Sequence, residues 1–564
     1  MTGRGAARRV PAEVWIVIGL TIVAAVVRFA TIGRQSYWAD EALTVHEVRM
    51  PFVAMLNAVA HAETTPPLYF ILAWAWAHVL GTGETALRSL SALVGIAVVP
   101  IAYLCGRDLV SRRAGVIAAA FATFNPFLIW YSQEARSYML LMALTGASFL
   151  WFIQTEREPS RRNIACWAVF SALALTSHFF AGFLVAPEAL WLLWRVRSRG
   201  VLLAAGALGA VQLALLPLAV GDTSHGVGWI HRTPLLTRVS QVAIEFGVSN
   251  VYRHVRIPVG LWGGAIVIAV ALLLLAVGGE RVERSGAALA GAIGAAVIVV
   301  PLALALVRPA DDFFLVRNLS PALIPILVAL AAACSAPRAR DFGIIAATAL
   351  LVMFVVATNE INTDTAFQRA DWRGVAHVLG PSSEPRAILI AGGKAAIPLK
   401  IMLPGVSWKQ PPDTRRLVFD QVAVVGSIAW ARIRGPGHRK GRALPIEDPT
   451  GAFYLGHRLV RNFHVAGYEL LHPWRLDTRQ VAARAGRFFS HAPASLLVLV
   501  QSPTGAGSAR RVRPSAGRRI AADAGLTYLA LPWNRCWSEV EPLAAGLRQH
   551  GCLRSRSRLP LLAP

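Results

Sequence analysis

Two adjacent carboxylates, Asp40 and Glu41, follow the first long apolar run of the chain. Arg88, Glu134 and Arg317 also lie beside apolar runs further along. A carboxylate can take a proton from a hydroxyl group as that oxygen attacks a carbon. Arginine binds phosphate through paired, charge-assisted hydrogen bonds. These residue types therefore fit a group transfer in which a hydroxyl attacks and a phosphate leaves.

Long apolar helices are the elements that must position these side chains. The chain has 564 residues, of which 55% are hydrophobic and 15% charged, whereas a soluble protein carries about a quarter charged residues. Its apolar runs are long enough to cross a hydrocarbon core of about 30 Å. The sequence therefore predicts a polytopic α-helical membrane protein.

We expect about eleven spans, since each needs about 20 residues. They cover approximately Val14–Ile32, Leu87–Gly106, Ala114–Tyr131, Tyr138–Ile153, Ile164–Phe180, Gly182–Trp194, Val201–Val220, Pro258–Val277, Ala287–Val307, Leu319–Cys334 and Phe342–Ala357. Pro67–Leu80 is too short to span and predicts a helix at the membrane interface. Residues 34–87 then form one external loop with interfacial helices.

Arginine clusters set the expected orientation, because positive residues favour cytoplasmic loops. This topology puts five clusters inside: Arg107/Arg112/Arg113, Arg157/Arg161/Arg162, Arg195/Arg197/Arg199, Arg281/Arg284 and Arg338/Arg340. The basic start predicts a retained first helix with a cytoplasmic N-terminus. The clusters also account for much of the net charge of +25, so we do not read that charge as a nucleic-acid footprint. The Ala-, Gly- and Arg-rich composition suggests a bacterial plasma membrane.

The composition changes after Asn359, so we expect a membrane domain over residues 1–358 and an extracytoplasmic α/β domain over residues 359–564. Alternating runs predict strands, and two other segments predict helices. The strands are Arg386–Ala391, Leu417–Val425, Ser495–Gln501 and Thr527–Leu531, and the helices are Val375–Leu379 and Arg479–Ser490. Cys536 and Cys552 are a disulfide candidate, because an external domain is in an oxidising compartment. The alternative is two unpaired thiols.

The topology brings polar groups from several loops to the outer surface, which is where we expect the site. They are Asp40, Glu41, His61, Glu63, Arg88, Glu134, Arg136, His178, Asp311, Asp312 and Arg317. Of these, His61, Arg88, Arg136, His178 and Arg317 are candidate substrate-binding residues, together with Tyr138. Each alone has an ordinary explanation, since a lone arginine at a helix end is commonly an anchor. The sequence contains no covalent-nucleophile motif such as GxSxG. It also contains no Walker or Rossmann motif in the external segments, so a nucleotide-linked donor is not supported. No metal spacing occurs and no cofactor is certain, although paired carboxylates leave a divalent metal possible.

Several motifs resemble the GT-C membrane glycosyltransferases, in the family-39-like branch with dolichyl-phosphate-mannose protein mannosyltransferases and bacterial aminoarabinose transferases. The motifs are Tyr37-Trp38-Ala39-Asp40-Glu41-Ala42, Thr65-Pro66-Pro67-Leu68-Tyr69, Leu87-Arg88-Ser89-Leu90-Ser91-Ala92-Leu93, Tyr131-Ser132-Gln133-Glu134-Ala135-Arg136-Ser137-Tyr138, Arg317-Asn318-Leu319-Ser320-Pro321 and Asp371-Trp372-Arg373. The resemblance covers roughly residues 14–380. One departure is Thr65, where relatives often have histidine, and His61 is the candidate to replace it.

The resemblance implies a role for each matching position. Asp40 would be the catalytic base, supported by Glu41, and Glu134 would be the second acidic residue. Arg88 would hold the site or the phosphate. Arg317 would bind the donor phosphate, and His178 matches a histidine often found there.

We therefore expect an integral membrane glycosyltransferase that moves a sugar from a polyprenyl-phosphate donor to an acceptor on the extracytoplasmic face, with inversion. The acceptor could be a protein, a glycolipid or an envelope glycan. The alternative function is a transporter or flippase of a lipid-linked sugar, which would need ionisable residues buried in the middle of helices. Arg28 and Glu188 are the candidates for such residues, and both are expected toward span ends. The sugar stays open.

Overall fold

The computed structural model describes residues 11–63, 65–222, 230, 233–249, 257–308, 312–391, 397–411, 414–427, 452–460, 463–488 and 496–504. The chain divides into two compact units. The helical unit comprises Met1–Arg34 and Thr44–Gln368, and the sheet unit comprises Gln35–Leu43 and Arg369–Pro564. The division after Gln368 lies close to the predicted boundary at residue 358, but the segment around Asp40 belongs with the sheet unit.

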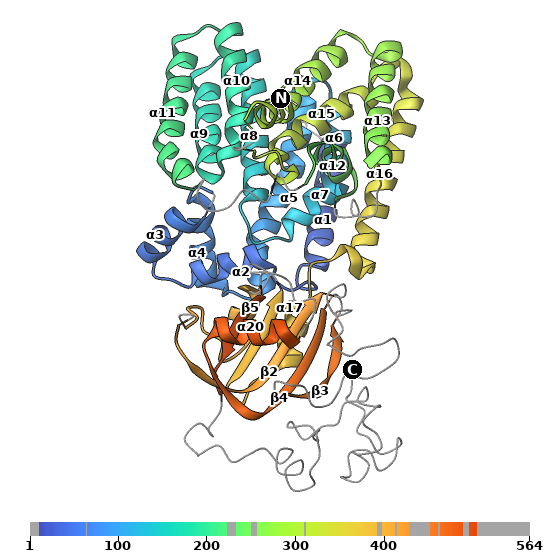
Figure 1. The fold of residues 1–564 in the computed structure, drawn as a ribbon. Coiled ribbons are helices and arrows are strands. Elements are labelled where there is room, and N and C mark those ends of the chain that lie inside the picture. The colour runs from blue at the N-terminus through green and yellow to red at the C-terminus, as the bar shows by residue number, and fades with distance from the viewer. Residues whose placement is uncertain are drawn as a thin grey trace, which may run out of the picture. The chain divides into compact units, whose positions relative to one another are not determined.

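Helices build almost all of the first unit (Figure 1). Its long helices are α1 (Ala12–Ala30), α5 (Glu84–Leu109), α6 (Arg112–Phe124), α7 (Pro126–Ser132), α8 (Tyr138–Arg157), α9 (Arg161–Ser177), α10 (Gly182–Arg195), α11 (Arg199–Asp222), α13 (Ile257–Gly278), α14 (Arg281–Val307), α15 (Leu323–Cys334) and α16 (Arg340–Thr363), with α7 a short continuation of α6. Shorter helices are α2 (Ala39–Val48), α3 (Phe52–Ala62), α4 (Leu68–Leu80) and α12 (Leu235–Val248).

All eleven predicted spans are helical, but fewer meet the length and composition of a membrane span. In the described part of the chain, eight helices do so, or nine if α6 and α7 form one bent span. The other two are α9, with 17 residues, and α10, with 14. Helix α4 has 13 residues and falls below spanning length, as predicted for the Pro67–Leu80 segment.

The third predicted span is broken where α6 meets α7, at an angle of 54°. Pro126 begins α7 and cannot donate a backbone hydrogen bond to the preceding turn. The Asn125 side chain instead caps α7 by accepting from the amides of Phe127 and Leu128, both at 3.1 Å. The break leaves carbonyls of α6 without helical partners, and the buried Arg28 guanidinium donates to those of Ala122 and Thr123. A buried charge is thus balanced at the negative end of a helix.

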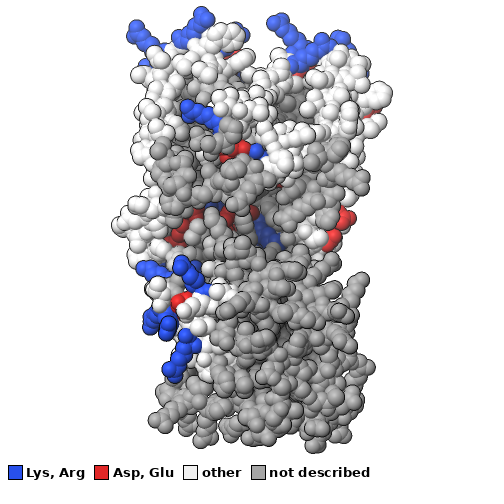
Figure 2. All heavy atoms as spheres, in the orientation of Figure 1, with Lys and Arg blue, Asp and Glu red and all other residues white. Residues whose placement is uncertain are grey.

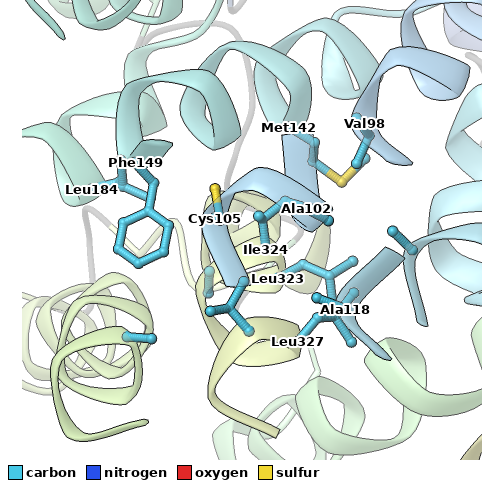
Figure 3. Close-up of a cluster of buried hydrophobic side chains, with 14 of the residues drawn as sticks. Val98, Ala102, Cys105, Ala118, Met142, Phe149, Leu184, Leu323, Ile324 and Leu327 are labelled. Atoms are coloured by element: carbon cyan, nitrogen blue, oxygen red, sulfur yellow. The ribbon is translucent and has the colours of Figure 1, made fainter. Parts of the chain in front are cut away.

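The core of the helical unit is a cluster of buried hydrophobic side chains where α5, α6, α8, α10 and α15 meet (Figure 3). It includes Val98, Ala102, Ala118, Phe149 and Leu323, all with no more than 1% of their surface exposed. Small residues on α5 and α6 let the helices approach closely, as membrane bundles require. This packing gives the loops at the helix ends a rigid base.

Lys and Arg side chains gather at one end of the helical unit (Figure 2). The helix bounds explain this, because α8 ends at Arg157 and α9 begins at Arg161, while α10 ends at Arg195 and α11 begins at Arg199. These are arginines of the predicted cytoplasmic clusters. Their sidedness in a membrane stays a prediction.

A five-stranded sheet of order β3-β4-β2-β1-β5 forms the second unit. Its strands are β1 (Arg386–Ala391), β2 (Leu417–Ser427), β3 (Ala452–Val460), β4 (Phe463–Leu476) and β5 (Leu496–Gln501), with β1 and β2 parallel and the other pairs antiparallel. Helices α17 (Trp372–Leu379) and α18 (Ile397–Met402) cover one face, and α20 (Thr478–Phe488) covers the other (Figure 1).

Three of the predicted strands and both predicted helices of this unit are present, whereas β3 and β4 were not predicted. The predicted strand Thr527–Leu531 and the disulfide candidate Cys536 and Cys552 lie outside the described residues. The three described cysteines, Cys105, Cys166 and Cys334, are free thiols.

Candidate active site

Asp40 and Glu41 lie in the first turn of α2 but differ in exposure. Asp40 is partly exposed, whereas Glu41 is fully buried. The Glu41 Oε2 atom accepts a hydrogen bond from the Trp38 amide at 3.4 Å and lies 4.0 Å from the Arg369 Nε. Glu41 therefore makes buried contacts within the sheet unit, whereas the Asp40 side chain keeps part of its surface accessible.

The segment before α2 is tied to the start of α17. The Ser36 hydroxyl donates to the Ala370 carbonyl at 2.9 Å and accepts from the Trp372 amide at 3.0 Å. The Asp371 side chain caps α17 by accepting from the Gly374 amide at 3.0 Å. The predicted Asp371-Trp372-Arg373 motif thus anchors the residues that lead to Asp40.

Tyr138, His178 and Arg317 come together in the helical unit, from three distant parts of the chain. The Arg317 guanidinium lies over the Tyr138 ring, 5.7 Å from its centre. The centres of the His178 and Tyr138 rings are 5.6 Å apart. Arg317 belongs to the 3-10 helix η6 (Val316–Ala322), and His178 caps the end of α9. All three are candidate substrate-binding residues of the sequence analysis, and their role in binding stays a prediction.

The His178 imidazole is neutral in this position. Burial, followed by the positive charges of Arg136 and Arg317, lowers its pKa to about 3. Its Nδ1 accepts a hydrogen bond from the Phe180 amide at 3.3 Å, so Nε2 carries the ring proton. His178 can therefore donate one hydrogen bond but does not add a positive charge at neutral pH.

We expect His178 to make folding weaker in acid. Because its pKa is lower in the folded chain than its ordinary value of about 6.5, the unfolded chain binds a proton first as the pH falls. The contribution of the neutral His178 to the free energy of unfolding is complete above about pH 6.5 and is smaller by about 2 kcal/mol at pH 5. Thermal unfolding in detergent at pH 7.5 and pH 5 should show a smaller acid loss for His178→Asn than for wild type. Equal losses would contradict the buried neutral imidazole.

Glu134 and Arg136 lie in the loop of residues 133–137 between α7 and α8, called here the Glu134 loop. Both side chains are buried, with 2% and 5% of their surface exposed. Arg136 makes a two-pronged ion pair with Glu63, with N–O distances of 2.9 and 2.7 Å. The sequence predicted Arg136 as a substrate ligand, but its paired contact with Glu63 favours a structural role.

Arg88 and His61 occupy contrasting positions. Arg88 on α5 is buried and donates to the Ile32 carbonyl at 3.0 Å, which links α5 to the end of the first span. His61 on α3 is exposed, and its Nδ1 lies 2.7 Å from the Asn57 carbonyl of the same helix. The structure thus does not bring His61 to the buried polar groups.

Arg238 and Asp312 form a second buried ion pair, which sequence reasoning missed as a pair. The guanidinium of Arg238 on α12 contacts both Asp312 oxygens at 2.9 and 2.5 Å, and it donates to the Phe314 carbonyl at 2.7 Å. Phe314 lies three residues before Arg317. The pair therefore fixes the segment that carries Arg317.

Thr44 and Glu47 were also missed. Both are buried on α2 and lie near Arg136 and Glu63. The spacing of residues 40, 44 and 47 could have indicated them, because these positions recur on one face of a helix. Among the residues that the structure describes, no group of three or more His, Cys, Asp or Glu side chains is arranged to hold a metal ion.

Residues 64–220 match the family model described as dolichyl-phosphate-mannose-protein mannosyltransferase. The match runs from α4 into α11 and includes Arg88, Glu134 and His178. It confirms over this segment the resemblance that the sequence motifs predicted. No curated protein matches the chain.

Three solved structures show weak likeness to the chain. Protein O-mannosyltransferase Pmt1-Pmt2 of S. cerevisiae, bound to the sugar donor, has 18% identity and a TM-score of 0.31 over 40% of this chain and 34% of that one. The Archaeoglobus fulgidus oligosaccharyltransferase in complex with Zn and sulfate has 12% identity and a TM-score of 0.40, over 64% of this chain and 55% of that one. ArnT from Cupriavidus metallidurans bound to undecaprenyl phosphate has 13% identity and a TM-score of 0.35, over 81% of this chain and 98% of that one. The chain thus spans a third of the yeast chain and about half of the archaeal chain.

Proposed function

We propose that this chain is an integral membrane glycosyltransferase that uses a polyprenyl-phosphate-linked sugar. The observation that carries the proposal is the family match over residues 64–220, because that segment holds Arg88, Glu134, Tyr138 and His178. Eight described helices with the length and composition of membrane spans support a lipid-borne donor. The type of sugar is left to experiment.

The donor phosphate would be held by Arg317, with Arg88 at the outer start of α5 supporting it. Charge grows on the phosphate as the bond to the sugar breaks, and a fixed guanidinium stabilises that charge. Arg317 is suited to this role because the Tyr138 ring and the Arg238–Asp312 pair restrict where it can lie. His178 would contribute a neutral hydrogen-bond donor beside the same ring.

The acceptor hydroxyl would be deprotonated by Asp40. In a single displacement the hydroxyl oxygen forms a bond to the anomeric carbon, its proton passes to the Asp40 carboxylate, and the bond from the carbon to the phosphate oxygen breaks. The electron pair of that bond stays on the polyprenyl phosphate. Attack opposite the leaving group would invert the anomeric centre. Glu134 would be the second acidic residue of the site.

The N-terminus would lie in the cytoplasm and the reaction would take place on the extracytoplasmic face, because arginine clusters favour cytoplasmic loops. The sheet unit would lie on the same extracytoplasmic side. The acceptor would be an envelope glycan, a glycolipid or a protein. A bacterial plasma membrane is the proposed location.

A carboxyl buried in the middle of a helix is the kind of group that a second candidate function, transport of a lipid-linked sugar between leaflets, would need. Glu188 lies in the middle of α10, not toward a span end as predicted, and is fully buried. Its Oε2 accepts from the Ser148 hydroxyl at 2.6 Å and from the Trp167 indole at 3.0 Å. These bonds link α8, α9 and α10, which accounts for the carboxyl as a packing contact.

Membranes that contain the full chain should be supplied with a panel of labelled polyprenyl-phosphate sugars. We expect one donor to be consumed, with the sugar recovered on an acceptor. Movement of the lipid-linked sugar between leaflets without consumption would instead support transport and contradict the proposed enzyme.

A further inference from the structure

Both side chains of the Glu63–Arg136 ion pair are buried, with 2% of the Glu63 side chain and 5% of the Arg136 side chain exposed. Removing one partner from such a pair leaves a charge without compensation in a region that excludes water. The two residues are far apart in the sequence, so the pair joins the segment after α3 to the Glu134 loop. Its charges cancel, and Arg136 therefore offers less attraction to a phosphate than an uncompensated arginine would.

Arg136 also makes contacts with two helices. Its Nη1 donates to the Thr44 hydroxyl on α2 at 3.2 Å, and its guanidinium lies over the Phe70 ring on α4 at 5.6 Å. Its backbone amide donates to the Glu134 carbonyl at 2.9 Å. One side chain thus holds the Glu134 loop against α2, α4 and the segment around Glu63.

The other end of the Glu134 loop is held by α1. The Gln133 side-chain amide donates to the Arg28 carbonyl at 2.9 Å and to the Thr31 hydroxyl at 2.8 Å. The Arg28 guanidinium donates to the Ser132 hydroxyl at 3.1 Å. Glu134 therefore lies between two fixed points, of which the Glu63–Arg136 pair is the second.

A second carboxyl, Glu47, lies in the same cluster and is also buried. Burial, followed by the negative charge of Glu63, raises the pKa of Glu47 to about 9. Both carboxyls are within electrostatic reach of the Arg136 guanidinium, but the paired contact of Arg136 is with Glu63. Glu47 therefore stays protonated at neutral pH, and Glu63 is the carboxylate on which Arg136 depends.

We propose that Glu63 is a positioning residue that acts through Arg136, and that the pair orders the Glu134 loop instead of binding the donor phosphate. This inference rests on the proposed function, since it assigns Glu134 to the acidic position of the site. It also changes the role that the sequence predicted for Arg136.

The test compares Glu63→Gln, Arg136→Gln and the double variant in the full chain. The matched control is Glu47→Gln, which makes the same substitution in the same cluster on a carboxyl that already holds a proton. One readout is sugar transfer, with kcat and donor KM measured separately. The other is thiol labelling of Ala135→Cys, quantified at that position by mass spectrometry, because Ala135 is fully buried in the Glu134 loop.

Each single variant should lower kcat by at least about tenfold, since small misplacements of a catalytic group have effects of this size. Donor KM should change by no more than about threefold, and the double variant should lose no more than either single variant. Thiol labelling at Ala135→Cys should rise to the same extent in the two single variants and the double variant. The Glu47→Gln control should match wild type in both readouts.

A rise in donor KM for Arg136→Gln but not for Glu63→Gln would make Arg136 a donor ligand and overturn the inference. The inference would also be overturned if the kcat losses of Glu63→Gln and Arg136→Gln added up in the double variant, or if Glu47→Gln lost as much kcat as these variants. If wild type consumes no donor, the proposed function fails, and labelling alone decides the inference. Equal increases in labelling would then support the positioning role, and unchanged labelling would refute it.

Discussion

Replacing Asp40 by asparagine should lower sugar transfer by at least about a hundredfold, the scale expected when a general base is lost. Asparagine keeps the shape of the side chain but cannot accept the proton of the attacking hydroxyl. The loss should appear in kcat, because the donor is held by other groups. The measurement is transfer from the donor that the panel identifies, in membranes with matched amounts of wild-type and variant protein.

Glu41→Gln is the informative comparison, because the neighbouring carboxyl is buried beside Arg369. This substitution should lower the unfolding temperature, since it removes a buried negative charge that lies 4.0 Å from the Arg369 Nε. Asp40→Asn should leave that temperature close to the wild-type value, because Asp40 is partly exposed. Equal transfer by Asp40→Asn and wild type would show that Asp40 is not the base.

Hydrophobic length made most of the helical unit predictable. All eleven apolar runs are helical because in such runs only the backbone can satisfy its own hydrogen bonds. The break at Pro126 was not predicted, since a membrane helix can tolerate proline when neighbours satisfy the freed carbonyls. Here Arg28 on α1 does so, and nothing local to Pro126 indicates that distant partner.

The sheet unit was predictable only in part. Strands β1, β2 and β5 are short apolar runs that a period of two can detect. Strands β3 and β4 contain Gly456, Gly467 and Pro473, residues that weaken a strand pattern. Their pairing with each other and with β2 outweighs this local preference.

The candidate site shows the same contrast. Motifs singled out Tyr138, His178 and Arg317, which do lie together. They did not show which arginine pairs with which carboxylate, because the partners lie in distant segments. Glu63 and Arg136 lie in two different loops, and Arg238 lies on α12 whereas Asp312 lies in the segment before η6. Pairing is decided by tertiary packing, and it separates arginines that hold the structure from those that remain candidates for the substrate.

Breaking the Arg238–Asp312 pair should lower the stability of the chain strongly. In Arg238→Met the Asp312 carboxylate, which has 4% of its surface exposed, loses the guanidinium that contacts both of its oxygens. Removing one partner of such a pair costs about 3–5 kcal/mol. The Phe314 carbonyl loses a donor as well, so the segment that carries Arg317 should loosen and donor KM should rise.

Thermal unfolding in detergent and donor KM test this expectation. Arg195→Gln is the matched control, because its ion pair with Glu156 has an N–O distance of 3.6 Å and the Arg195 side chain is 64% exposed. Breaking an exposed pair costs at most about 1 kcal/mol. The double variant Arg238→Met/Asp312→Leu should recover much of the stability, since it leaves no buried charge, but it should not restore donor KM, since the Phe314 carbonyl still lacks its donor. Equal unfolding temperatures for Arg238→Met and Arg195→Gln would show that the pair does not hold this segment.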